Sequence, residues 1–234
     1  MKFLPAVFGL ILPFSFSAVV NASTVWNSLL RSAEIRNPAD MPTVPEIKTF
    51  NFAEQGYQPV WNGTTYECRN AQGESGYNLT PIDPGSSGRI VAPCADLSGM
   101  DLSKRDLSLS DFRGANMRGT DMRFSLITGV QFGGAVLAGA NLHQASSEMS
   151  SFVGANMRDI RADQTNFNES NFHGADMRGA DLRNSKLAEV QFTDADLTRA
   201  KLESAFLIGA VYNQKTRLPI SETVALRRGM RRIP

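Results

Sequence analysis

The sequence repeats with a period of five residues along half of its length. Every fifth residue from Leu97 to Tyr212 has a core-type side chain, apart from the polar Ser147 and the small Ala162. An α-helix repeats its buried face every 3.6 residues and a β-strand every two, so neither explains a spacing of five. A solenoid does explain it, because each short unit buries its apolar face by stacking on its neighbours. The 24 positions are Leu97, Leu102, Leu107, Phe112, Met117, Met122, Ile127, Phe132, Leu137, Leu142, Ser147, Phe152, Met157, Ala162, Phe167, Phe172, Met177, Leu182, Leu187, Phe192, Leu197, Leu202, Leu207 and Tyr212.

Two further columns accompany these core positions. A small residue, usually Ala or Ser, stands two places before most of them, and the residue between is usually polar, often Asp or Asn, as at Ala95 and Asp96. The alternation of small, polar and large side chains is typical of a strand over three residues. The last two places of most units are polar or Gly, which favours a corner.

The units ADLSG, ANMRG, ANLHQ, ADMRG, ADLRN and ADLTR resemble the repeats of the pentapeptide repeat family. The resemblance covers residues 95–214. It implies an all-β fold, a right-handed quadrilateral parallel β-helix (a solenoid) with four pentapeptides per coil and therefore about six coils. The segment YNQKTRLP, residues 212–219, also resembles the sequence that closes such a helix.

Two units depart from the pattern. One places Ser147 in the core column, where a buried hydroxyl needs a hydrogen-bond partner. Another exchanges the small and large places, with Ile160 at the first and Ala162 at the second. The sequence leaves two interpretations open, a locally repacked or bulged coil and a kink that shapes a binding surface.

The first 22 residues have the pattern of a secretory signal peptide. Lys2 precedes a short apolar run, and Val20-Asn21-Ala22 offers small residues at a cleavage site. An uncleaved membrane anchor is the alternative, although Pro5 and Pro13 disfavour a stable span. We expect cleavage near Ala22 and a periplasmic or extracellular mature protein.

Residues 23–94 are expected to form a linker followed by a small β-rich cap. Asn62-Gly63 lies between aromatic and β-branched residues and predicts a hairpin. Cys68 and Cys94 are the only cysteines, and an even count in an exported chain favours a disulfide between them over two separate thiols. Too few histidines accompany them for a metal site, and no cofactor is expected.

Residues 215–234 are expected to form a basic cap helix over the last coil. Ser221 is a suitable N-cap, and Val224, Ala225, Leu226 and Met230 give an apolar stripe. Four arginines of this segment form either a solvated face or a contact site for an anionic surface. The sequence also leaves open a homodimer that forms through the last coil. The four arginines are Arg227, Arg228, Arg231 and Arg232.

A second candidate interaction surface lies on the repeats. Four-unit coils place every twentieth residue in one row, so Arg118, Arg158 and Arg178 align. A solvated face with local ion pairs is the alternative, because several Asp residues are close by in sequence.

No catalytic motif is present in the sequence, so an enzyme, for instance a hydrolase, is disfavoured. Members of the resembled family that mimic DNA and bind gyrase in the cytoplasm give an alternative function. Residues 95–214 carry 12 basic and 15 acidic residues, a net charge of only −3, which disfavours mimicry of DNA. The favoured hypothesis is therefore an exported, rigid, non-catalytic module in the cell envelope, with an unknown protein partner and no nucleic acid.

Overall fold

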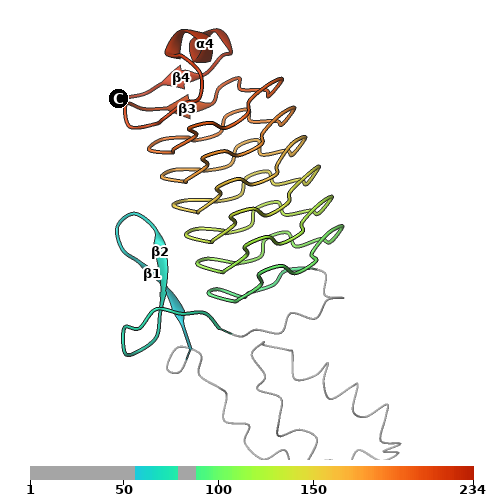
Figure 1. Cartoon of the computed structure of the whole chain (residues 1–234), viewed down its shortest axis with the longest axis vertical. Helices are drawn as coiled ribbons and strands as arrows, with labels where there is room; N and C mark the ends of the chain where they lie inside the picture. Colours follow the sequence, from blue (N-terminus) through green and yellow to red (C-terminus); the bar gives the residue numbers. More distant parts are fainter. Residues whose placement is uncertain (1–55, 79–87) are drawn as a thin grey trace, which may run out of the picture. The chain divides into compact units, whose positions relative to one another are not determined.

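The computed structural model describes residues 56–78 and 88–234, which belong to one compact unit, Asn51–Pro234. The predicted signal peptide and most of the predicted linker lie outside these residues. The regular elements are short: strands β1 (Gln58–Trp61), β2 (Tyr66–Arg69), β3 (Val211–Tyr212) and β4 (Arg231–Arg232), and one helix, α4 (Glu222–Arg227). From Val91 to β3 the chain winds through stacked coils, drawn from green to orange in Figure 1.

Each coil is made of four pentapeptides. In each pentapeptide, the residue before the core position forms a parallel bridge to the residue 20 places later in the chain, from Val91↔Asp111 to Gln191↔Val211. That spacing corresponds to four units of five, so the structure is an all-β solenoid of the kind that the repeat pattern implies. Each bridge is one residue long, and the walls are ladders of bridges rather than extended strands. The last bridge, Asp196↔Arg217, is longer by one place because it falls at the closing segment.

The corners of a coil are tight turns, and in many units the Asp or Asn before the core residue stabilises the turn. In the first complete unit the Met100 amide donates to the Leu97 carbonyl at 3.1 Å, and Gly99 has a φ of 68°. The Asp96 carboxylate accepts a hydrogen bond from the Ser98 amide at 3.2 Å. This side-chain turn recurs in other units and explains why Asp or Asn occupies the place before the core residue.

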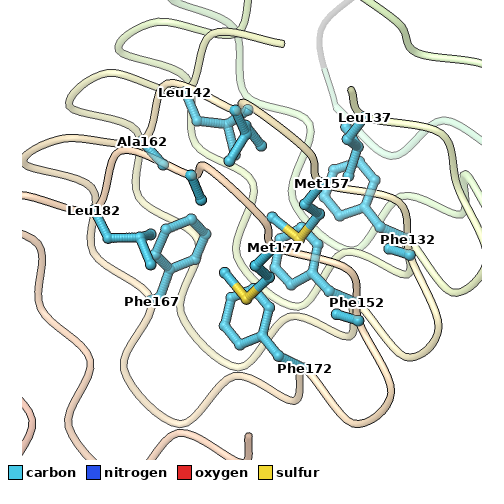
Figure 2. Packing of buried hydrophobic residues seen from close by; sticks show 14 of the residues in the cluster. Phe132, Leu137, Leu142, Phe152, Met157, Ala162, Phe167, Phe172, Met177 and Leu182 are labelled. Atoms are coloured by element: carbon cyan, nitrogen blue, oxygen red, sulfur yellow. The ribbon is translucent and has the colours of Figure 1, made fainter. Parts of the chain in front are cut away.

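The core positions form four columns along the axis. All 24 are buried, and none is more than 4% exposed. One column is aromatic for five coils and ends in Tyr212. Its successive ring centroids lie 5.7, 5.0, 4.8 and 5.6 Å apart, with interplanar angles of 23° or less. Figure 2 shows the middle of this column, and its members are Phe112, Phe132, Phe152, Phe172 and Phe192.

The two irregular units are repacked without a bulge. Phe167 follows Ser147 in the same column and packs edge-on against Phe152 and Phe172, at centroid distances of 5.7 and 5.2 Å (Figure 2). Ile160 is fully buried at the place where most units have a small residue such as Ala. Its larger volume accompanies the smaller volume of Ala162, which is buried at the place where most units have a large residue. The bridges Ser146↔Asn166 and Arg161↔Asp181 keep the same spacing through this region. Of the two interpretations, the structure therefore supports the locally repacked coil.

Ser147 gives a stability test because its hydroxyl is buried without a hydrogen-bond partner among the described residues. An unsatisfied buried hydroxyl is unfavourable, so Ser147→Ala should raise the free energy of unfolding by about 1 kcal/mol. The matched control is Ser170→Ala, because the Ser170 hydroxyl donates to the Ser147 carbonyl at 2.7 Å. That variant should lose about 1 kcal/mol in the same denaturant titration. A loss in both variants would mean that the Ser147 hydroxyl has a partner.

The amino-terminal β element is a hairpin held on the coils. β1 and β2 pair antiparallel from Gln58↔Arg69 to Trp61↔Tyr66, and the Asn62 side chain accepts hydrogen bonds from the amides of Thr64 and Thr65 in the connecting loop. A disulfide joins Cys68 to Cys94, with a Cα–Cα distance of 5.6 Å. Further along the hairpin, the Thr65 hydroxyl donates to the Gly154 carbonyl at 3.0 Å.

Glycine corners allow this close approach. A side chain at Gly133 would place its Cβ 2.9 Å from the Tyr66 ring, and one at Gly154 would meet Thr65 at 2.6 Å. Both contacts are too short for a real Cβ, so the hairpin lies against corners where the chain has no side chain.

The carboxy-terminal segment covers the last coil, although less of it is helical than the sequence predicts. Ser221 caps α4 by accepting a hydrogen bond from the Val224 amide. The helix ends at Arg227 because Gly229, with a φ of 83°, reverses the chain. Ala225 and Met230 are buried against the core, whereas Leu226 is 51% exposed.

Two expectations for the cap are therefore wrong. Leu226 is not part of the buried stripe, since it lies on the solvent side of a short helix. Arg231 and Arg232 are not in a helix, because they form β4 and pair in parallel with Val211 and Tyr212 of β3.

Candidate interaction surfaces

The arginine row on the repeats is mostly neutralised by aspartates. Arg178 donates to both carboxylate oxygens of Asp176, at 2.8 and 2.7 Å, and Arg158 reaches the same carboxylate from the preceding coil at 2.5 Å. Two of the three arginines thus share one anion. The alternative of a solvated face with local ion pairs describes this part of the row.

The same arrangement recurs wherever Asp precedes the core residue and Arg follows it. Arg donors hold the pKa values of Asp121 and Asp181 below the usual range, chiefly through side-chain hydrogen bonds from Arg123 and Arg183. Such pairs are largely solvated and contribute little to stability. They do fix the guanidinium groups against the wall, which leaves few free charges on these faces.

The units of Arg118 and Arg158 both have Asn in place of the aspartate, at Asn116 and Asn156, but Arg158 pairs with Asp176 of the following coil and Arg118 has no such partner among the described residues. The Arg118 side chain is exposed, and among the described residues no carboxylate pairs with it. The equivalent place in the next coil is Val136, which offers no anion either. Of the three residues predicted for this row, Arg118 alone keeps its charge available for a partner.

The four arginines of the carboxy-terminal segment have separate roles. Arg228 donates to the carbonyls of Leu202 and Ala205 and so bonds the cap to the last coil. Arg232 forms an ion pair with Glu222 at 2.9 Å. Arg227 and Arg231 are exposed, and these two are the remaining candidates for contact with an anionic surface.

Arg228 should therefore matter for stability. Arg228→Ala removes charged hydrogen bonds to two carbonyls of the last coil, and we expect a loss of about 1.5–3 kcal/mol in the free energy of unfolding. Arg231→Ala is the control from the same segment and should change stability by less than about 0.5 kcal/mol. Equal losses in thermal or denaturant unfolding would contradict a structural role for Arg228.

A pocket under the hairpin was not anticipated from the sequence. It has a volume of about 230 Å³ and lies between Trp61 and Tyr66 of the hairpin and the adjacent coils. The pair Gly133-Gly134 was the available signal, because consecutive glycines at a corner allow another chain to approach closely. Its lining residues are Trp61, Tyr66, Arg113, Gln131, Gly133, Ser151 and Val153.

The geometry defines a solenoid of five-residue units, four to a coil, with a disulfide-linked hairpin on its side. The family model for pentapeptide repeats matches residues 94–124, 150–184 and 175–211, with 8 copies. The repeat region of the chain belongs to the pentapeptide repeat family. No curated protein matches it. Within the described part of the chain, no helix has the length and apolar character needed to cross a membrane.

Several solved structures are similar to parts of the chain. A trypsin-treated form of QnrB1, a plasmid-mediated fluoroquinolone resistance protein, is 15% identical, with 64% of this chain and 92% of that chain covered and a TM-score of 0.42. HetL from Nostoc, involved in heterocyst differentiation regulation, is 21% identical, with 55% and 76% covered and a TM-score of 0.23. A protein of the Arabidopsis thaliana thylakoid lumen is 14% identical, with 64% and 81% covered and a TM-score of 0.22. We draw no functional argument from these likenesses.

Proposed function

We propose that this protein is a rigid, non-catalytic interaction module that acts outside the cytosol, in the cell envelope. The observation that carries the proposal is the disulfide between Cys68 and Cys94, which links the hairpin to the start of the repeats. Such bonds persist in oxidising compartments and are rare in the cytosol. The signal-peptide pattern in residues 1–22 supports the same location.

The proposed mechanism is recognition by a preorganised surface. A right-handed stack of six coils holds its surface side chains in rows at a fixed spacing of ~4.8 Å. Little conformational freedom is then lost when a partner binds. Arg118 is the first candidate contact, because the other cations of its row are already paired with Asp176.

Binding to gyrase as a mimic of DNA is the alternative that the family suggests. That function requires a strongly acidic rod in the cytosol. The repeat region, with 12 basic and 15 acidic residues, lacks this charge, and its aspartates are in part paired with arginines. The alternative is therefore the less favoured of the two.

Export is tested by fractionating bacterial cells that express the full chain and determining the amino terminus of the stable product. We expect a product that begins after Ala22 and leaves the cytosol. An uncleaved cytosolic precursor that inhibits supercoiling by gyrase would reject the proposal in favour of the alternative.

The partner surface is tested by crosslinking the mature protein in envelope extracts. Arg118→Glu should remove the main crosslinked protein, since it reverses an unpaired charge. Arg183→Glu is the matched control, because Arg183 is held by Asp181 at 2.6 Å and its charge is already neutralised. An unchanged pattern with Arg118→Glu would exclude this row as the contact.

A further inference from the structure

The pocket beneath the hairpin has an aromatic wall that is fixed in place. Trp61 and Tyr66 lie with ring centroids 5.1 Å apart, and their planes are inclined at 57°. The Tyr66 ring rests on Gly133, and the Arg113 guanidinium lies 5.5 Å from its centroid on a cation–π contact. Trp61 remains 46% exposed despite these contacts, so part of its indole surface is available to a ligand.

The pocket is not built for an anion. Its one cation, Arg113, donates two hydrogen bonds to the Asp111 carboxylate at 2.9 and 2.7 Å. This pairing raises the pKa of Arg113 and cancels its charge locally. No other lining residue is charged, so a neutral ligand fits the pocket better than a phosphate or carboxylate.

Two other lining residues of the pocket, Gln131 and Ser151, are polar and uncharged. Gln131 and Ser151 occupy the same row in successive coils and are joined by a backbone bridge. The side-chain amide of Gln131 donates only one long hydrogen bond, of 3.4 Å, to the Gly129 carbonyl. The Ser151 hydroxyl has no hydrogen-bond partner among the described residues. Both groups can donate and accept hydrogen bonds. Asn171 and Gln191 continue the row beyond the pocket.

We propose that this pocket binds one ring of a neutral saccharide. A sugar ring has an apolar C–H face that packs on aromatic rings and hydroxyl groups that both donate and accept hydrogen bonds. Trp61 and Tyr66 contact the apolar face, while Gln131 and Ser151 bond to the hydroxyls. The volume of about 230 Å³ is smaller than the pockets of drug-sized ligands, which suits a single ring.

The row beyond the pocket gives the ligand a direction. Asn171 and Gln191 place further amides on the same face, so the adjoining rings of an oligosaccharide extend along this row. A peptide that binds as an added strand would need free main-chain groups on the protein. Here the backbone amides bond to neighbouring coils, as the backbone amide of Gln131 does to the Ser110 carbonyl at 3.0 Å. This inference goes beyond the proposed function and does not depend on export.

The test is saturation-transfer NMR and fluorescence titration of the mature, oxidised protein with three neutral trisaccharides. These are the β-1,4-linked N-acetylglucosamine trimer, cellotriose and maltotriose. We expect at least one to bind with a dissociation constant in the millimolar range or below. Trp61→Ala should weaken that binding at least tenfold and Trp61→Phe should retain most of it, while Gln131→Ala with Ser151→Ala should also weaken it.

The matched control is Tyr77→Ala, which removes another exposed aromatic ring of the amino-terminal region that does not line the pocket. It should leave saccharide binding unchanged, and all variants should melt at the wild-type temperature. The proposal is overturned if none of the three trisaccharides binds the wild-type protein at 10 mM (a concentration on the order of ten times a weak dissociation constant). Equal binding by the Trp61→Ala and wild-type proteins overturns it as well, and so does binding of unrelated extended peptides at this pocket in place of the sugars.

Discussion

Phe152→Ala should lower the free energy of unfolding by about 3–5 kcal/mol, the largest effect that we expect from a single substitution. Phe152 is fully buried in the aromatic column and contacts three other rings, with centroid distances of 5.0 Å to Phe132, 4.8 Å to Phe172 and 5.7 Å to Phe167. The cavity cannot collapse, because hydrogen bonds between coils fix the backbone on both sides. The measurement is denaturant unfolding followed by circular dichroism.

The control removes the same side chain from the surface. Phe124 is 44% exposed at a corner, and its ring packs edge-on against His143. Phe124→Ala should change stability by no more than about 0.5 kcal/mol. Similar losses in the two variants would mean that the aromatic column is not the packed interior of the protein.

Removing the disulfide should release the hairpin from the coils. The bond closes a loop with a sequence separation of 26 residues, for which loop entropy predicts a loss of about 3–4 kcal/mol in the Cys68→Ala, Cys94→Ala double variant. The loss should be local, since repeat coils contact only their neighbours and those far from the hairpin keep their packing. Hydrogen exchange should therefore quicken at β1 and β2 and at the coils they cover.

Chemical reduction of the wild-type protein should reproduce this exchange pattern. Thr65→Ala is a graded control, because it removes only the hydroxyl bond to the Gly154 carbonyl and should cost about 1 kcal/mol. Unchanged protection of the hairpin amides after reduction would show that the other contacts suffice to hold it.

The sequence predicts the fold of the repeats well because each unit carries the information for its own turn. The core residue, the small residue before it and the Asp or Asn between them recur in most units, and the structure uses each in one way. The hairpin around Asn62-Gly63 and the N-cap at Ser221 are equally local signals, and both elements are present.

Features that depend on contacts between successive coils were harder to predict. The packing of Phe167 beyond Ser147 joins two coils, and so does the ion pair between Arg158 and Asp176. The bonds from Arg228 to the last coil, which separate it from the other basic residues of the cap, also join segments that are distant in sequence. No local pattern shows such partners, since they follow from the stacking itself.

The candidate site illustrates the same limit. The sequence predicts that Trp61 and Tyr66 are strand residues, but whether they share a pocket with Gln131 and Ser151 depends on how the hairpin docks. That docking rests on Cys94 and on the glycine corners, which are far from the hairpin in sequence.

The most direct test of the solenoid is a cysteine crosslink between adjacent coils. The side chains of Gln144 and Gln164, which occupy the same place in successive coils, are hydrogen-bonded to each other at 2.8 Å on the surface. Gln144→Cys with Gln164→Cys should form a disulfide on mild oxidation, because stacked backbones lie within the usual Cα–Cα range of about 4.4–6.8 Å. Gln144→Cys with Glu169→Cys, in which the second cysteine lies one pentapeptide further along, should not. Equal crosslinking of both pairs, or crosslinking of the second pair alone, would contradict a coil of four pentapeptides.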